Sequence, residues 1–249
     1  MDVRNVDNEQ YYEQEGLKMQ YKGRKKDILD ILYASGRISV SKLAETLFVS
    51  EMTIRRDLSE MEKDGVIKRY RGGAVLNPVS SKMPITQRFF VDENEKIVLS
   101  KKAIGFLSDD LTVFIDSSST CQYIIPYINR FKNISIVTNS VNALLMASKS
   151  KIACVLIGGK YYERDMCFVG SIAEQYANEF NVDIAFFSSL GLSEDGIISD
   201  TDIEQTMIRK IIMSHSKKNV FLFEKNKLNK IFTYTVCHKS DVDEVILSI

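Results

Sequence analysis

The chain has no tryptophan, only three prolines and no apolar run that approaches the roughly 20 residues of a membrane-spanning helix. Its N-terminus lacks the basic-then-apolar order of a secretory signal peptide, so we expect a cytoplasmic protein without a membrane segment. Basic and acidic residues number 33 each, which gives a net charge of zero. A uniformly basic nucleic-acid binder is thereby excluded, and an uneven distribution of charge becomes the informative property.

Cysteine and histidine are also scarce, with four and two copies. The cysteines are far apart, without a Cys-x-x-Cys pair or a histidine at ligand spacing, so we expect no zinc site, no structural disulfide, no other metal and no cofactor. Cys121 follows a polar loop at which a helix can begin and stabilise a thiolate. We favour packing for Cys121, because a free cysteine usually behaves as a small hydrophobe.

The charge is unevenly distributed along the chain. Residues 17–77 contain 13 Lys/Arg and 8 Asp/Glu, a net charge of +5, whereas residues 1–16 carry one Arg and five acids, a net charge of −4. We interpret residues 1–18 as a disordered acidic extension. Met19 is an alternative start, because Glu15-Gly16 can be encoded by a sequence that resembles a bacterial ribosome-binding site.

Two short helical patterns separated by a tight turn follow in the basic segment. Ser50 is placed to cap a helix in which Ile54, Leu58 and Met61 recur at i, i+4 and i+7 and form a core face. The preceding pattern, residues 41–47, ends just before this cap. The spacing predicts a helix-turn-helix whose second helix enters the major groove of DNA.

A basic hairpin is predicted directly after the second helix, with strand-forming runs around Gly72-Gly73. Such a tip can reach phosphates or the minor groove, whereas a charge cluster alone is more often a solvated surface. The cap and turn beside it favour a winged helix-turn-helix. The outward face of the helix and the hairpin supply the predicted DNA-binding residues: Ser50, Met52, Thr53, Arg55, Arg56, Lys68, Arg69 and Arg71.

These residues carry a family resemblance. The segment from Ser50 to Leu58 resembles the Ser-x-x-Thr-Ile-Arg-Arg-Asp-Leu recognition helix of the DeoR-type regulators, and Gly72-Gly73 resembles the Gly-Gly wing that follows it in that family. The resemblance implies a DNA-binding transcriptional regulator.

The sequence predicts two domains. Residues 24–34 form the first helix of a winged helix-turn-helix domain at 19–76, and residues 77–90 have linker composition. Residues 87–107 resume a helical period and either open the second domain, at 91–249, or form a connector helix.

The second domain alternates apolar runs with helix-like segments, which predicts an α/β fold with a mostly parallel sheet. The apolar runs are 111–115, 134–137, 153–157, 182–187 and 220–223, and the helical segments are 119–129, 141–148, 170–180 and 203–215. Residues 233–249 are predicted to form one or two closing strands.

Ligands of open α/β sheets gather beyond the carboxyl ends of the strands, and small, hydroxylated or cationic residues follow each apolar run here. Hydroxyls and backbone N–H groups can hold a phosphate, a lysine can neutralise it, and Asp116 or Glu204 can accept from sugar hydroxyls. Any one such loop is ordinary turn chemistry. Residues 116–120 give the strongest signal, because three consecutive serines exceed what a helix cap needs.

This part of the chain resembles the DeoR-type effector domain, which is related in fold to ribose-5-phosphate isomerase and typically senses a phosphorylated sugar. One departure is Glu224-Lys225-Asn226-Lys227, where the family usually shows Asp-x-Ser-Lys. The predicted effector-binding residues are Asp116, Ser117, Ser118, Ser119, Thr120, Thr138, Asn139, Gly158, Gly159, Gly170, Glu204 and Lys227.

Together, the sequence patterns and the resemblance to the DeoR-type regulators predict a repressor of sugar uptake or catabolism genes that is not an enzyme. We expect it to bind double-stranded operator DNA as a homodimer or homotetramer and to respond to a phosphorylated sugar. One alternative is a sugar-phosphate isomerase or transferase with a DNA-binding domain, in which Asp116, Glu204 and Lys227 perform acid/base work. Another is an interaction protein whose helix-turn-helix binds protein, which the arginines and the basic wing disfavour.

Overall fold

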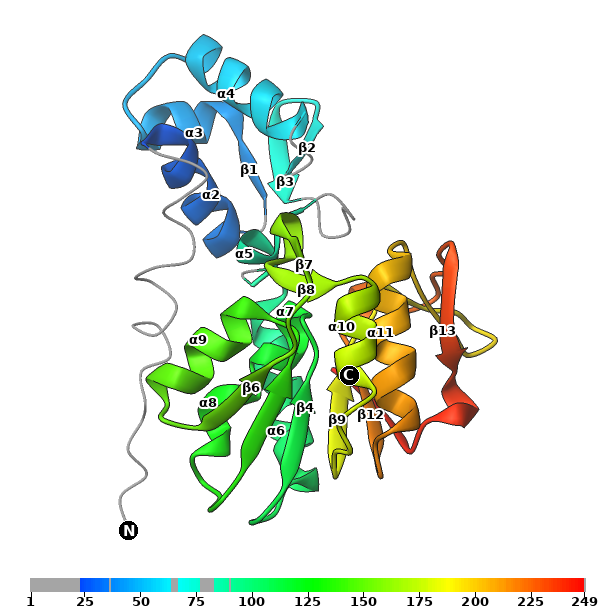
Figure 1. Ribbon diagram of the computed structural model, residues 1–249. Helices are drawn as coiled ribbons and strands as arrows, with labels where there is room; N and C mark the ends of the chain where they lie inside the picture. Colours follow the sequence, from blue (N-terminus) through cyan, green and yellow to red (C-terminus); the bar gives the residue numbers. More distant parts are fainter. Residues whose placement is uncertain (1–22, 36, 64–66, 77–82, 90, 249) are drawn as a thin grey trace. The chain divides into compact units, whose positions relative to one another are not determined.

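The computed structural model describes residues 23–35, 37–63, 67–76, 83–89 and 91–248 (Figure 1). The chain divides into two compact units, with the division between Val91 and Asp92. The predicted acidic extension, the alternative start at Met19 and much of the predicted linker lie outside the described residues.

The N-terminal unit combines helices with a small antiparallel sheet in the strand order β1-β3-β2. Its elements are α2 (Arg24–Ser35), β1 (Arg37–Ser39), α3 (Val40–Thr46), α4 (Glu51–Lys63), β2 (Ile67–Tyr70), β3 (Gly73–Leu76) and α5 (Ile85–Arg88). The predicted core face of α4 is confirmed, because Ile54, Leu58 and Met61 are fully buried. They pack with Leu43 of α3 and Ile28 of α2. The arrangement is the predicted winged helix-turn-helix.

Local contacts fix the turn between α3 and α4. The Ser50 hydroxyl accepts a hydrogen bond from the Thr53 backbone N–H at 3.2 Å, which confirms Ser50 as a helix cap. Phe48 makes the turn with a left-handed backbone, at a φ of 53°. Asp57 is buried in α4 and binds the Arg24 guanidinium of α2, at 2.5 Å and 3.2 Å. The Asp of the recognition-helix motif therefore joins the first helix to the recognition helix.

The C-terminal unit is built on a six-stranded sheet in the order β14-β12-β9-β4-β5-β6, and every neighbouring pair is parallel. The strands are β4 (Thr112–Ile115), β5 (Ser135–Thr138), β6 (Ala153–Leu156), β9 (Ile184–Phe187), β12 (Asn219–Phe223) and β14 (Glu244–Leu247). Each of the five predicted apolar runs overlaps one of these strands. The predicted α/β class is thus confirmed.

Helices cover the two faces of this sheet (Figure 1). They are α6 (Glu93–Ala103), α7 (Ser119–Gln122), α8 (Ile125–Ile128), α9 (Val141–Lys149), α10 (Ser171–Ala177) and α11 (Ile203–Ser214). Against one face, α10 and α11 pack on the buried rings of Phe114, Phe187 and Phe221. The ring centroids of Phe187 and Phe221 are 5.1 Å apart, and those of Phe114 and Phe187 are 5.6 Å apart. None of the described helices has the length and apolar character that crossing a membrane requires.

The strand order reverses between β4 and β9. From β4 the chain moves outward through β5 to β6, then returns to the other side of β4 and continues through β9 and β12 to β14. The loops after β4 and β9 therefore leave the sheet side by side. Ligands of open α/β sheets bind at such a reversal point.

Two predicted segments are more broken than their periodicity suggested. Residues 87–107 do not form one helix, because Asp92 adopts a left-handed backbone with a φ of 52° and separates α5 from α6. Residues 119–129 divide into α7 and α8, and Pro126 lies in the first turn of α8. A proline has no backbone N–H and is tolerated in the first turn of a helix, where that donor has no intrahelical partner, so α8 begins anew at this point.

The closing segment contributes to two sheets. It contains β14 and β13 (Tyr234–His238), and β13 pairs with β11 (Ile197–Asp200) in an antiparallel sheet that β10 (Gly191–Leu192) completes. A separate hairpin joins β7 (Lys160–Tyr162) to β8 (Cys167–Val169). The predicted closing strands are present as β13 and β14. The shorter strands β7, β8, β10 and β11 were not predicted, because two to four residues carry too little periodicity.

Candidate functional site

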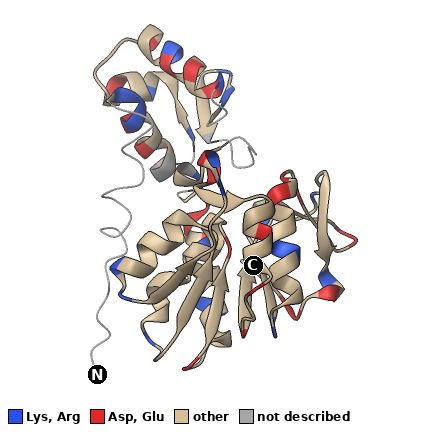
Figure 2. Cartoon of the chain, viewed as in Figure 1, with Lys and Arg blue, Asp and Glu red and all other residues tan. Residues whose placement is uncertain are grey.

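The outward face of α4 carries exposed basic and apolar side chains. Figure 2 marks the Lys and Arg positions of this helix in blue and its Asp and Glu positions in red. Met52 is 79% exposed, and the Arg56 and Arg55 side chains are 83% and 51% exposed. Arg55 pairs with Glu51 at 2.9 Å, and Arg56 lies 3.4 Å from Glu60. Exposed ion pairs of this kind contribute little to stability, so both guanidinium groups remain available to a polyanion.

The hydroxyls at the start of α4 already have partners. The Ser50 hydroxyl caps the helix and lies 2.9 Å from the Thr53 hydroxyl. Both hydroxyls therefore already have hydrogen-bond partners within the helix start.

The hairpin of β2 and β3 turns through Arg71 and Gly72, and Gly72 has a φ of 94° that favours glycine. Gly73 must be small, since a Cβ there would lie 2.4 Å from the Ile38 carbonyl oxygen. The Arg69 backbone N–H donates to Glu62 of α4 at 2.8 Å, which fixes the hairpin beside the helix. Lys68 and Arg71 are exposed and Arg69 is half-buried. The predicted wing residues therefore share one hairpin that is joined to the recognition helix.

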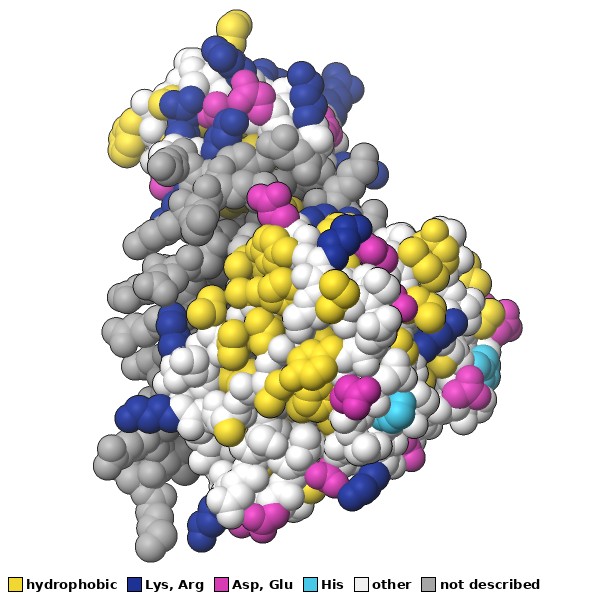
Figure 3. Space-filling view, in the orientation of Figure 1, with side chains coloured by type: hydrophobic (Ala, Val, Ile, Leu, Met, Phe, Trp, Pro, Cys, Tyr) yellow, Lys and Arg dark blue, Asp and Glu magenta, His cyan; other side chains and the backbone are white. Residues whose placement is uncertain are grey.

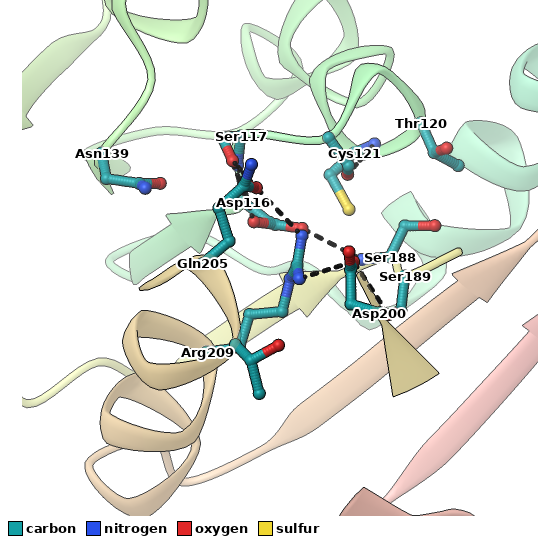
Figure 4. A network of polar contacts seen from close by, with 12 residues as sticks. Asp116, Ser117, Thr120, Cys121, Asn139, Ser188, Ser189, Asp200, Gln205 and Arg209 are labelled. Atoms are coloured by element: carbon teal, nitrogen blue, oxygen red, sulfur yellow. Dashed lines mark hydrogen bonds and ion pairs between the residues drawn. The ribbon is translucent and has the colours of Figure 1, made fainter. Parts of the chain in front are cut away.

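In the C-terminal unit, the reversal point of the sheet holds a buried charge network centred on Arg209 of α11 (Figure 4). The guanidinium Nε donates to Asp116 at 3.3 Å and Nη1 donates to Asp200 at 2.9 Å. Burial alone would lower the pKa of Arg209, but the carboxylates of Asp116 and Asp200 outweigh it and raise the pKa above its ordinary value. All three side chains are less than 10% exposed, so the two ion pairs are buried.

Gln205, one turn before Arg209, extends the network. Its Oε1 accepts from the Ser117 hydroxyl at 3.1 Å and from Arg209 Nη2 at 3.3 Å, and its Nε2 donates to the buried Asp165. The network thus joins the loop after β4, the end of β11 and the segment between β7 and β8 to one helix.

Asp116 is fully engaged by the fold. Its Oδ1 accepts from the Ser117 backbone N–H at 2.7 Å, and its Oδ2 accepts from the Ser188 backbone N–H and from Arg209. A sugar hydroxyl would have to compete with these donors. We therefore assign Asp116 a positioning role that connects the loops after β4 and β9.

The loop after β4 also reaches Lys227, in the short 3-10 helix η3 (Lys225–Lys227) that follows β12. The ammonium group donates to the Thr120 hydroxyl at 3.1 Å and the Ser188 hydroxyl at 2.9 Å, and it lies 2.7 Å from the Glu224 carboxylate. Ser118 caps α7 beside this cluster, accepting from the Cys121 backbone N–H, and Ser119 is buried. The loops after β4, β9 and β12 therefore meet at one cationic group.

The remaining predicted residues lie around this cluster. The Thr138 hydroxyl donates to the Ile115 carbonyl at 2.6 Å, so Thr138 connects two strand ends. Asn139 Nδ2 donates to the Phe168 carbonyl at 3.0 Å, and its buried Oδ1 has no hydrogen-bond partner among the described residues. Glu204 lies on the side of the β7–β8 hairpin, where it pairs with Lys160 at 3.2 Å.

The three predicted glycines differ in what they require. Gly170 has a φ of 84°, and a Cβ at Gly159 would lie 2.8 Å from the Cβ of Ala173. The positive φ therefore explains Gly170, and close packing explains Gly159. A Cβ at Gly158 would meet no atom within 4 Å, so nothing in the structure explains this glycine.

Sequence reasoning missed Arg209, Asp200 and Gln205. A signal existed in MIRKIIM, where an arginine interrupts an apolar helical run four residues after a glutamine. Cys121 is fully buried, and burial raises the pKa of its thiol well above the usual value, in accord with the packing role.

Replacing Arg209 by methionine should destabilise the C-terminal unit by about 3–5 kcal/mol, because Asp116 and Asp200 would face each other without their cation. Urea denaturation followed by circular dichroism measures the loss. The neighbouring Lys210 is exposed, and Lys210→Met should change stability by about 0.5 kcal/mol or less. Equal stability of the two variants would show that the Arg209 network contributes nothing to the free energy of unfolding.

Two family models together match nearly all of the described chain. One, described as a DeoR-like helix-turn-helix domain, matches residues 24–79, and one described as a DeoR C terminal sensor domain matches residues 91–248. A ribose 5-phosphate isomerase of Methanocaldococcus jannaschii aligns with 55% of this chain and 55% of its own, at 18% identity and a TM-score of 0.42.

Full-length relatives are named as repressors. The lactose phosphotransferase system repressor of Staphylococcus epidermidis is 28% identical over 225 residues, which cover 88% of this chain and 89% of that protein. The glycerol-3-phosphate regulon repressor of Escherichia coli is 26% identical over 223 residues, 89% of this chain and 88% of its own. These names disfavour the enzyme alternative. By the match of both of its domains, the chain belongs to the DeoR family of helix-turn-helix transcriptional regulators.

Proposed function

We propose that this protein represses a sugar-related operon by binding operator DNA through α4 and the β2–β3 hairpin, and that a phosphorylated sugar at the Lys227 cluster controls it. The observation that carries the proposal is the convergence of the loops after β4, β9 and β12 on Lys227, at the reversal point of the sheet. The relatives' names, which refer to a lactose phosphotransferase system and a glycerol-3-phosphate regulon, support a sugar-related operon.

On DNA, the two kinds of exposed side chain would divide the work. Arg55, Arg56 and Met52 would meet base edges and phosphates in the major groove, while Lys68 and Arg71 of the hairpin would bind the backbone. Phosphate contacts make affinity fall with salt, whereas base contacts choose the operator sequence.

The effector would bind through groups that are partly accessible. The Lys227 side chain is 16% exposed, and Ser118 is half-buried beside it. A lysine and hydroxyls can hold a phosphate, and the carboxylate of Glu204, whose side chain is 33% exposed, would accept from sugar hydroxyls. Effector binding changes repression if the ligand has different affinities for two arrangements of the protein.

A homo-oligomer would supply the paired recognition helices that operator half-sites require. Hydrophobic side chains gather on one face of the C-terminal unit, over β6 and the β7–β8 hairpin (Figure 3). The exposed large hydrophobics of this region include Leu145, Val155, Tyr161, Ile172 and Tyr176. Large exposed apolar areas are typical of interaction surfaces, which supports self-association.

Replacing Arg56 by alanine should weaken operator binding by about tenfold or more, since one good arginine contact to DNA contributes about 1–3 kcal/mol. Fluorescence anisotropy with an operator selected from genomic fragments measures the change. Arg130 is an exposed arginine of the C-terminal unit, and Arg130→Ala should leave affinity unchanged. An equal loss of DNA binding and effector binding in Arg56→Ala would contradict the division of labour.

A thermal-shift screen of sugar phosphates and their unphosphorylated parents tests the effector assignment. A ligand at about 100 times its dissociation constant should stabilise the native protein by about 2.7 kcal/mol, and only a phosphorylated compound should do so. If no phosphorylated sugar shifts the transition, the phosphate role of Thr120 and Lys227 is wrong, while the DNA-binding assignment is unaffected.

A further inference from the structure

Lys227 is surrounded by acceptors with which an incoming anion must compete. An ammonium group has three N–H donors. Three acceptors already surround this one: the hydroxyls of Thr120 and Ser188, at 3.1 Å and 2.9 Å, and the carboxylate of Glu224, at 2.7 Å. Lys227 donates to the two hydroxyls, whereas the buried Glu224 Oε2 makes an ion pair without a hydrogen bond among the described residues. An anionic ligand therefore competes first with Glu224.

Glu224 is an ionised and buried neighbour. It is 2% exposed, and its Oε1 accepts from the Thr120 hydroxyl at 2.7 Å. Burial raises the pKa of this carboxyl, but the positive charges of Lys227 and Lys96 and the hydrogen bond from Thr120 outweigh it, and the pKa lies below its usual value. Any anion that reaches Lys227 also meets the charge of Glu224.

The backbone that carries Lys227 is fixed from the other side. In η3, the Lys225 backbone N–H donates to Glu95 of α6 at 2.7 Å, and the Asn226 side chain donates to the carboxylate of Asp92. Lys227 consequently stays close to Glu224, and the charges around it include three carboxylates and the ammonium of Lys96. The carboxylates around Lys227 therefore weaken its attraction for anions in general.

We infer that Glu224 selects the effector: the site takes a phosphate ester whose neighbouring carbon carries a free hydroxyl. The phosphate replaces Glu224 at Lys227, and the adjacent hydroxyl donates to the Glu224 carboxylate in place of the lost ammonium contact. A bare anion, or an ester without that hydroxyl, leaves a buried carboxylate without this donor, which is costly. The inference rests on the proposed effector role of Lys227 and adds the ligand's class to it.

Two matched probes test whether the site requires a hydroxyl on the carbon next to the phosphate ester. Glycerol 3-phosphate has a free hydroxyl on the carbon next to the ester, whereas ethyl phosphate has none. Isothermal titration of the full-length protein should show that glycerol 3-phosphate binds at least about tenfold more tightly, because a site built to accept from a hydroxyl discriminates against ligands that lack it.

Glu224→Gln keeps the side-chain shape and an acceptor for Thr120 but removes the charge that competes for Lys227. In this variant, ethyl phosphate should gain affinity until the two probes differ by less than about threefold. The thermal transition of each variant shows that it is folded. A variant that keeps the wild-type ratio overturns the inference and leaves the proposed effector site intact.

Lys227→Met separates this failure from a failure of the proposed site. If Lys227 binds the phosphate, this variant should bind neither probe. Binding of either probe at wild-type affinity would overturn both the role of Lys227 and the inference about Glu224. Failure of both probes to bind the wild type and Glu224→Gln would overturn the inference as well.

Discussion

The Arg209 guanidinium is buried between the carboxylates of Asp116 and Asp200, and the ligand edge of the C-terminal unit depends on this contact. Charges taken out of water are costly unless each is paired and hydrogen-bonded. Here Asp116 also binds the backbone of Ser188, and Asp200 binds the hydroxyl of Ser189, so the loops after β4 and β9 are fixed to the same group. Their geometry is therefore set by the fold before any ligand arrives, which lowers the cost of ordering a site.

Around this fixed centre, the accessible charges are balanced. Lys227 is neutralised by Glu224 in the same way that Arg209 is neutralised by its carboxylates, but the Lys227 side chain is 16% exposed and the Arg209 side chain only 4%. The buried group serves as scaffold, and the more accessible group is the one that a ligand can reach. The proposed effector chemistry thus follows from a difference in exposure between two compensated cations.

Local signals made the N-terminal unit predictable. The Ser50 cap, the period of Ile54, Leu58 and Met61 and the glycines of the hairpin all act within a few residues, so the winged helix-turn-helix followed from the sequence. Strand β1 escaped prediction, because three residues become a strand only by pairing with β3.

Long-range contacts made the effector site less predictable. Asp116 and Arg209 are 93 positions apart, and Thr120 and Glu224 are 104 positions apart, so no pattern in the sequence links them. Alternating strands and helices still predicted that the loops after β4, β9 and β12 lie at one edge of the sheet. The sequence could not show which polar groups are already hydrogen-bonded to each other, as Asp116 is to Arg209 and to the Ser188 backbone.

Regulation requires that effector and operator influence each other's binding. The operator affinity should be measured by fluorescence anisotropy without effector and at saturating effector, and the effector affinity by calorimetry with and without operator. The account predicts that each ligand weakens the other by the same factor, about 5–150-fold. An operator affinity that does not change at saturating effector would contradict it.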